Sequence, residues 1–409
     1  MLEGGDAKGH RGLGFQALPG HGPALGRRRK THENRDLTRG YRMGLVVNIV
    51  TQMEGGGAQR AAVMVTQKLR ELGFDSEVWF LYKKRPTYNQ LPFVRCVLDR
   101  PPKGPRDVIR IIRTLHKWLK ELSPEGVITY THYANVIGQA IAYFAGVQHR
   151  LATQRNPSDT YPWLARWLDL IWGNIGVYTA NVFVSSSVQK SFKAYPDAYL
   201  KRSFVVLNGI EPLHSHLAKE EAREKFSLPL DSFGIVNVGR LAEQKNQALL
   251  IEVLSILKAT GYDDVFLAIA GDGELREQLE LLARRRQVRD RVYFLGELMP
   301  NDVPDFLRTG DVFVFPSRFE AFGFALVEAM MMGLPVIASD IDAHREVVGD
   351  AGILLPLNEA EVWVEAIKGL IANEEKRMRL ADASRSRAGN FSAENMVKGY
   401  LSLLFGSGQ

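Results

Sequence analysis

The sequence predicts an α/β protein built from two Rossmann-like domains that face each other across a cleft. A chain of 409 residues is long for one hydrophobic core and is typical of two domains. Short apolar runs alternate with helical stretches, a pattern that indicates parallel sheets with helices on both faces. The alternation stops at a polar, proline-bounded segment, residues 211–230, and then begins again. We therefore expect one domain before this linker and one after it.

The first domain is predicted to span residues 43–212. Its opening strand, residues 45–51, is mostly apolar, as expected for a strand that is buried on both faces of its sheet. A glycine-rich turn then leads into a helix, residues 58–72. The same unit repeats, with strands expected at residues 76–82, 126–131, 150–155, 181–187 and 204–207 and helices at residues 107–122, 135–145 and 162–178.

The second domain is predicted to span residues 213–389, and a short helix at residues 219–226 lies within the linker. The strand–helix pattern resumes at residue 233. Strands are expected at residues 233–238, 265–270, 292–295, 311–316, 335–338 and 352–355. Helices are expected at residues 244–260, 274–286, 302–308, 324–333 and 359–372. A charged helix should follow and end at about residue 388, and a last helix should span residues 395–404.

Charge and composition exclude some classes of protein. The formal net charge is +6, but residues 1–43 carry nine Lys and Arg residues against four acidic ones, which leaves about +1 for the rest of the chain. The body therefore lacks the basic surplus of a nucleic-acid-binding protein. Residues 1–42 are rich in Gly, Arg and His without hydrophobic periodicity, and we expect them to form a disordered basic tail.

Cysteine usage and the lengths of the apolar runs bear on the compartment. The single cysteine, Cys96, excludes an internal disulfide and a cysteine-based zinc site, and fits a buried strand residue in a reducing compartment. No apolar run reaches the roughly 18 residues of a membrane span, and the N-terminus lacks the apolar region of a signal peptide. We expect a cytoplasmic protein, with at most peripheral contact at the cytoplasmic face of a membrane.

Residues 317–333 hold the clearest candidate site. Glu328 has apolar residues before and after it at helical spacing, so its carboxylate lies on an apolar helix face and requires a polar partner. Glu320 follows the preceding strand, at the sheet edge where open parallel sheets bind ligands. The pattern predicts a nucleotide-sugar, with its hydroxyls at the two carboxylates and its phosphates at the backbone N–H groups that open the helix, those of Gly323, Phe324 and Ala325.

Two cations follow the first strand of the second domain. Arg240 stands beside Gly239 at the carboxyl end of that strand, and Lys245 is expected to begin the next helix. Because a cation at a helix N-terminus opposes the helix dipole, Lys245 there requires an anion. The pair predicts a phosphate site, since a diphosphate leaving group needs positive charge where its own negative charge grows. A surface ion pair near a helix start is the alternative.

The first domain contributes two candidates. Gly55, Gly56 and Gly57 join the first strand to the first helix, and consecutive glycines let a phosphate approach the backbone closely. The run is neither a Walker motif nor a GxGxxG fingerprint. His132 ends a strand and would face the cleft, although an isolated histidine is more often structural.

Three weaker signals remain open. Asp340 and Asp342 form a DxD that could hold a divalent metal, but an ordinary loop explains them better. Asp272 ends another strand, where it lines the cleft or forms a tight turn. Residues 161–172 hold three of the six tryptophans with arginines nearby, which suits a membrane interface or a buried helix equally.

Taken together, these residues resemble the family 4 glycosyltransferases of GT-B fold. The resemblance covers roughly residues 45–405 and rests on Glu320 and Glu328 spaced as E-x7-E, the cations Arg240 and Lys245, the glycine run at 55–57 and the Val-Leu-Asn-Gly-Ile sequence at 206–210. The family has no counterpart to the tail at residues 1–42. It implies a nucleotide-sugar donor, transfer with retention of anomeric configuration, and no metal or other cofactor.

The resemblance also assigns roles. It implies that Arg240 and Lys245 hold the diphosphate with help from the backbone at residues 323–325. Glu328 would bind the ribose and Glu320 the sugar hydroxyls. The glycine loop would approach the phosphates from the acceptor domain, and His132 would contact the donor sugar near the reaction centre. Residues 390–409 would cross back onto the first domain.

The expected activity is transfer of a sugar from a UDP- or GDP-sugar to a glycan or lipid-linked acceptor in cell-surface polysaccharide or glycolipid synthesis. Both acids of the E-x7-E pair are committed to hydroxyl recognition, so we expect a same-face substitution in which the leaving phosphate helps to deprotonate the acceptor. A nucleotide-sugar epimerase or hydrolase of the same fold, or a non-catalytic nucleotide-sugar-binding protein, is the alternative. The sequence leaves the sugar, the base and the acceptor undetermined.

Overall fold

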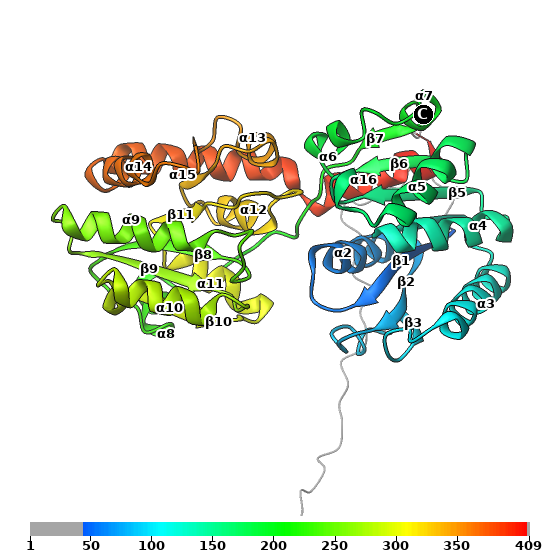
Figure 1. Cartoon of the computed structure of the whole chain (residues 1–409), viewed down its shortest axis with the longest axis horizontal. Coiled ribbons are helices and arrows are strands. Elements are labelled where there is room, and N and C mark those ends of the chain that lie inside the picture. The colour runs from blue at the N-terminus through cyan, green and yellow to red at the C-terminus, as the bar shows by residue number, and fades with distance from the viewer. Residues whose placement is uncertain (1–43, 407–409) are drawn as a thin grey trace, which may run out of the picture. The chain divides into compact units, whose positions relative to one another are not determined.

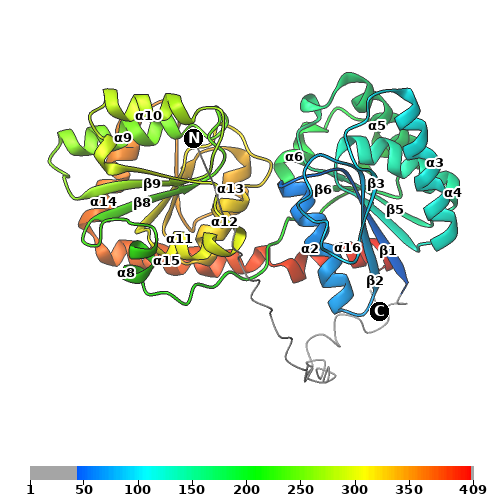
Figure 2. The same cartoon turned by 90° about the horizontal axis from the view of Figure 1, so that it is seen from below.

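The computed structural model describes residues 44–406, and the predicted tail at residues 1–42 lies outside them. Two parallel sheets organise the described chain, one of seven strands and one of six, which confirms the predicted α/β architecture. Helices cover both faces of each sheet (Figures 1 and 2).

The first sheet has the strand order β3-β2-β1-β4-β5-β6-β7, and every pairing is parallel. Its strands are β1 (Leu45–Met53), β2 (Asp75–Lys83), β3 (Val94–Leu98), β4 (Gly126–Thr129), β5 (His149–Gln154), β6 (Ala180–Phe183) and β7 (Ser203–Val205). Its helices are α2 (Gly57–Glu71), α3 (Pro105–Leu122), α4 (Gln139–Ala145), α5 (Trp163–Ile175), α6 (Ser186–Ser191) and α7 (Asp197–Leu200).

The second sheet repeats this plan in the order β10-β9-β8-β11-β12-β13. Its strands are β8 (Phe233–Val238), β9 (Val265–Ala270), β10 (Val292–Gly296), β11 (Val312–Phe315), β12 (Val336–Ser339) and β13 (Ile353–Leu355). The helices are α8 (Lys219–Lys225), α9 (Gln247–Ala259), α10 (Arg276–Arg285), α11 (Val303–Arg308), α12 (Phe324–Met331), α13 (Asp342–Val348), α14 (Ala360–Ala372) and α15 (Glu374–Ala388). One more helix, α16 (Ala393–Phe405), follows them.

Each sheet reverses its strand order once, between β1 and β4 in the first and between β8 and β11 in the second. Connections on the two sides of such a point leave in opposite directions and open a crevice at the carboxyl ends of the strands. The glycine run at residues 55–57 follows β1, and His132 follows β4. In the second sheet Arg240 follows β8 and Glu320 follows β11. The candidate residues therefore stand at both crevices.

Buried apolar strands account for the stability of the sheets. Val46, Val47, Ile49 and Val50 of β1 are all fully buried, as the central strand of a parallel sheet requires. All six residues of β9 are buried as well.

The chain crosses between the two sheets twice, and the crossing segments are paired. Ile210 donates its N–H to the carbonyl of Phe391 at 2.9 Å, and Ala393 donates to the carbonyl of Ile210 at 3.0 Å. A Cβ added at Gly209 would lie 2.2 Å from the carbonyl oxygen of Ser392, so only glycine allows this approach.

The last helix, α16, returns to the first sheet, as expected. It packs against α2 and β5 (Figure 2). The ring of Phe405 at its end stacks on Phe74, with ring centroids 5.7 Å apart.

Some element boundaries differ from the prediction. Cys96 lies in a strand, β3, as expected, but it is half-buried, and the bounds of β3 were not predicted. The strand expected at residues 181–187 ends at Phe183, because the Ser185 hydroxyl accepts from the N–H of Val188 and begins α6. The strand expected at 126–131 ends at Thr129, and the helix after it begins with a π-helical segment, Ala134–Gly138.

Candidate functional site

A cavity of about 1570 Å³ is lined by residues of both domains. Every predicted site residue except Asp272 lines it. Those residues are Gly55, Gly56, Gly57, His132, Gly239, Arg240, Lys245, Glu320, Gly323, Phe324, Ala325 and Glu328.

Lys245 and Glu320 form an ion pair on the second-domain wall of this cavity. The loops that carry them are joined, since Arg318 donates its N–H to the Gln244 carbonyl at 2.8 Å and the Gln244 amide donates to the Phe319 carbonyl at 2.9 Å. Lys245 does not begin the next helix as predicted. Helix α9 starts at Gln247 after Asn246 adopts a left-handed conformation, so the position of Lys245 is set by this loop and its carboxylate partner.

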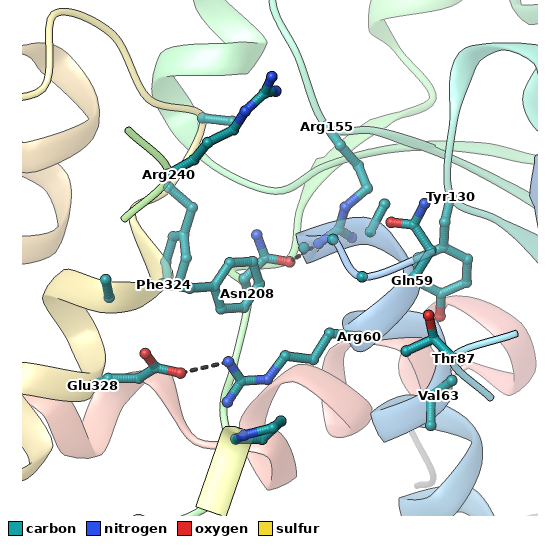
Figure 3. A pocket seen from close by; sticks show the side chains of 18 of the residues that line it. Gln59, Arg60, Val63, Thr87, Tyr130, Arg155, Asn208, Arg240, Phe324 and Glu328 are labelled. Carbon is teal, nitrogen blue, oxygen red and sulfur yellow. Dashed lines mark hydrogen bonds and ion pairs between the residues drawn. The ribbon is translucent and has the colours of Figure 1, made fainter. Parts of the chain in front are cut away.

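Glu328 lies on α12 and is only 4% exposed. The polar partner that its apolar helix face requires is Arg60 of α2, whose Nη1 donates to Oε1 of Glu328 at 2.5 Å. The two side chains point toward each other from the two domains (Figure 3). Arg60 was not predicted, because 268 residues separate it from Glu328 and no local pattern marks the contact.

The N-termini of α2 and α12 meet at the same cavity. A Cβ added at Gly57 would lie 3.0 Å from the Phe324 ring, so the two helix starts are in van der Waals contact. Neither helix has a side-chain cap or an acidic residue in its first turn. Gly323 precedes α12 with a φ of +92°, a conformation that favours glycine. Two uncapped N-termini lining one cavity are well suited to an anion.

A neighbouring cavity of about 690 Å³ is lined by Gly239, Arg240 and Asp272. Gly239 and Arg240 line the larger cavity as well. Arg240 Nη2 lies 2.9 Å from Oε2 of Glu274, and both side chains are exposed. The Asp272 carboxylate accepts from the N–H of Gly273 at 2.8 Å, which is the tight-turn interpretation of this residue.

His132 is half-buried on the first-domain wall. Its ring lies 5.3 Å from that of Tyr161 and 4.3 Å from that of Tyr133, measured between centroids. Burial lowers the pKa of His132 from its ordinary value, so the imidazole is neutral at pH 7. A neutral imidazole at the cavity can donate a hydrogen bond to a sugar hydroxyl or accept one from it.

Arg155, directly after β5, lines the cavity, although it was expected only as one of the arginines near the tryptophan-rich segment. It is 8% exposed, its Nη2 donates to Oδ1 of Asn208 at 2.5 Å, and its guanidinium lies 5.6 Å from the Tyr130 ring (Figure 3). Its position at a strand end was the available signal. The contact with Asn208 ties the first sheet to the segment that crosses to the second domain.

Behind this wall is a buried carboxyl group. Asp169 of α5 is fully buried and accepts from Gln154 Nε2 and from the Tyr199 hydroxyl, both at 2.9 Å. Burial raises the pKa of Asp169 to about 6, and these hydrogen bonds limit the rise. The Gln154 side chain also accepts from the hydroxyl of Tyr161, at 2.8 Å. The network therefore extends to Tyr161, whose ring packs against that of His132.

The DxD sequence is explained as a loop. Both oxygens of Asp340 accept from Arg345, at 2.5 and 2.7 Å, and Asp342 begins α13. Within residues 44–406, His, Cys, Asp and Glu side chains form no group of three that could hold a metal ion. Metal independence remains a prediction.

The tryptophan-rich helix α5 has two faces. Trp163 is 79% exposed and Trp167 is 59% exposed, whereas Trp172 packs partly buried against the core. The buried-helix interpretation therefore holds for the Trp172 side of α5, and the membrane-interface interpretation stays a prediction. Across residues 44–406, no helix has the length and apolar character needed to span a membrane.

Comparison with known proteins identifies related sequences. Residues 218–387 match a family model described as "Glycosyl transferases group 1". The lipopolysaccharide core biosynthesis glycosyltransferase LpsE of Rhizobium meliloti (strain 1021) is 26% identical over 312 residues, which cover 72% of this chain and 89% of that protein. The UDP-Gal:alpha-D-GlcNAc-diphosphoundecaprenol alpha-1,3-galactosyltransferase of Escherichia coli is 28% identical over 270 residues, covering 62% and 68% of the two chains.

Solved structures share the arrangement of the two sheets. The crystal structure of Anabaena HepE in complex with UDP-glucose superposes with a TM-score of 0.75 at 19% identity, covering 88% of this chain and 99% of that one.

Proposed function

Because the chain is a glycosyltransferase of GT-B fold, with a group 1 glycosyl transferase domain at residues 218–387, we propose that its donor is a UDP- or GDP-sugar bound in the large cavity. One observation carries this proposal: the N-termini of α2 and α12 and the cation Lys245 line the same cavity as the carboxylates Glu320 and Glu328. The helix ends and the cation suit a diphosphate. The carboxylates suit ribose and sugar hydroxyls, and HepE, which shares the fold, was solved in complex with UDP-glucose.

We assign the reaction as retaining transfer without a metal, as in the family 4 enzymes. Glu320 and Glu328 are each paired with a cation, which disfavours either as a nucleophile. The bond between the anomeric carbon and the leaving phosphate oxygen breaks, and the acceptor oxygen bonds the same face of that carbon. The acceptor proton passes to the leaving phosphate. Lys245, Arg240 and the helix N-termini stabilise the charge that grows on the diphosphate.

We further propose that the acceptor is a glycan or a lipid-linked glycan presented at a membrane surface. The exposed face of α5 with Trp163 and Trp167 supports this, as does the exposed face of α3, where Ile109 and Ile112 lie beside arginines. Amphipathic aromatics and aliphatics mixed with cations favour the interface of an anionic membrane. The E. coli relative is named for a diphosphoundecaprenol-linked acceptor.

A donor panel tests the proposal. UDP-, GDP- and ADP-sugars are screened by thermal shift, and the stabilising donors are incubated with lipid-linked glycan acceptors. We expect one donor class to raise the melting temperature and to give an α-linked product from an α-linked donor, in EDTA as in buffer. Inversion at the anomeric carbon, or a requirement for added metal, would contradict the mechanism. Incubation without acceptor separates transfer from epimerase or hydrolase activity, since a transferase leaves the donor largely unchanged.

A further inference from the structure

We propose that Arg60 is a displaceable partner of Glu328 and that the donor nucleotide takes its place. The ribose hydroxyls bind Glu328, and the released Arg60 guanidinium moves to the diphosphate. This inference rests on the proposed function, because it requires a nucleoside diphosphate in the cavity. In this arrangement Arg60 is a phosphate-binding residue from the first domain. Its contact with the diphosphate explains how the enzyme would bind nucleotides in preference to nucleosides.

The first observation is the asymmetry of the pair. The Arg60 side chain is 45% exposed, whereas the Glu328 side chain is 6% exposed. Arg60 loses little when it leaves the pair, since nearly half of its side chain is already exposed to water. Glu328 cannot remain unpaired, because a buried carboxylate without a partner is strongly destabilised. Two ribose hydroxyls are donors that replace the guanidinium at this carboxylate.

The second observation is where Arg60 stands. It lies in the first turn of α2, three residues after Gly57, which ends the glycine run. Gly57 contacts the Phe324 ring at the start of α12. A guanidinium that leaves Glu328 is therefore beside the two helix N-termini assigned to the diphosphate. Its planar fork of donors is suited to phosphate oxygens.

The third observation is the balance of charge around the cavity. Its lining carries as many cationic as anionic side chains, Arg60, Arg155, Arg240 and Lys245 against Glu211, Glu297, Glu320 and Glu328. Three of these cations already contact a carboxylate, Arg60 with Glu328, Arg240 with Glu274 and Lys245 with Glu320. A diphosphate gains a further cation when one of these pairs opens. When the Glu328 carboxylate binds the ribose hydroxyls instead of Arg60, the Arg60 guanidinium becomes free as the phosphates enter the cavity.

The exchange makes a thermodynamic prediction that an ordinary binding residue would not. A nucleoside breaks the ion pair but offers Arg60 no phosphate, so the pair competes with it. A nucleoside diphosphate breaks the pair and accepts the guanidinium. Removing the guanidinium should therefore change the two affinities in opposite directions.

The test uses Arg60→Met, which keeps an unbranched, flexible side chain and removes the guanidinium with its charge. Calorimetric titration of the full chain with uridine, UDP, guanosine and GDP gives the dissociation constants. For the base that binds, we expect Arg60→Met to bind the nucleoside about two- to fivefold more tightly, as for loss of a partly exposed ion pair. We expect it to bind the diphosphate about tenfold or more weakly, as for loss of a charge-assisted hydrogen bond.

Two results would overturn the inference. Equal weakening of nucleoside and diphosphate would make Arg60 a residue that only orients Glu328. Unchanged affinities for both would mean that Arg60 is not displaced. If wild-type protein binds none of the four probes, the proposed donor class fails, which is a different result from either of these.

Two further variants complete the experiment. Arg286→Met removes an arginine from an exposed ion pair with Glu252 on the second domain, outside the cavity lining, and should leave all four affinities unchanged. In a Glu328→Gln background there is no ion pair to displace, so adding Arg60→Met should no longer tighten nucleoside binding. A gain that persists in that background would contradict competition for Glu328.

Discussion

Lys245 directs its ammonium group at the carboxylate of Glu320, and its Nζ also lies 4.8 Å from the centre of the Phe315 ring. The two residues are 75 positions apart and belong to loops that follow neighbouring strands, β8 and β11. The pair holds the cation in place before any donor arrives. A preorganised charge of this kind acts mainly on the transition state, because little reorganisation is needed when the diphosphate leaves.

Lys245→Ala should therefore lower kcat by about 100-fold and change KM much less. Steady-state kinetics with the donor identified by the panel give both constants. Lys258→Ala removes a lysine from α9 that donates only to the Gln287 carbonyl, and should keep wild-type kcat. A kcat for Lys245→Ala within about twofold of wild type would remove this residue from the leaving-group site.

Asp169 should make the stability of the first domain depend on pH. Its pKa, raised by burial to about 6, lies above the ordinary value of 3.8 that it regains on unfolding. The folded domain therefore binds a proton more tightly than the unfolded chain, and stability falls as the pH rises from about 4 to above 6. The difference in the free energy of unfolding approaches about 3 kcal/mol at pH 7.

Asp169→Asn removes this titration. Urea unfolding of both proteins between pH 4 and pH 8 should show Asp169→Asn gaining on wild type as the pH rises, whatever constant offset the changed hydrogen bonds introduce. Asp263→Asn, at an exposed ion pair with Arg291, is the matched control and should run parallel to wild type. A constant difference between Asp169→Asn and wild type would show that Asp169 does not titrate in this range.

Gly209 should tolerate no side chain. An added Cβ would lie 2.2 Å from the Ser392 carbonyl, so Gly209→Ala must force apart the two paired segments that cross between the domains. We expect a loss of about 1–3 kcal/mol in the free energy of unfolding, together with reduced activity. Gly104→Ala, where an added Cβ meets nothing within 4 Å, should do neither. Thermal unfolding that is the same for both variants would contradict the close approach.

The exposed face of α5 should bind membranes. Replacing Trp163 and Trp167 together by serine should weaken sedimentation with vesicles that contain anionic phospholipid by about tenfold or more, since each side chain buries a large apolar surface in the interface. Met378→Ser on α15 changes another exposed apolar side chain and should leave sedimentation unchanged. Equal binding of all three proteins would show that this helix has another partner.

The sequence predicted the strands and the strand-end residues well, for a physical reason. Buried parallel strands are short apolar runs, and polar residues directly after them, such as Arg240 and Glu320, must stand at one edge of a sheet. Glycines after β1 and before α12 mark close backbone approaches in the same local way. These signals lie within a few residues of each other and are visible without the fold.

Partners were harder to predict than positions. Glu328 was expected to require a polar partner, but Arg60 could not be named, because their contact depends on how two separate domains meet. The start of α9 was misplaced for a smaller reason. Asn246 takes a left-handed conformation and delays the helix, which the apolar pattern around it does not reveal.

Because of helix α16, the two domains can complete their folding at different times during translation. The first sheet needs residues 393–405, which leave the ribosome after every other helix and strand that the structure describes, to cover α2 and β5. The second sheet and its helices are complete once residue 388 has emerged. We therefore expect the second domain to become protease-resistant first during translation, although its sequence begins later. In a chain held on the ribosome through an added C-terminal linker, so that residue 388 has emerged and residues 393–405 have not, protease should find a protected second domain beside a first domain that is still cleaved.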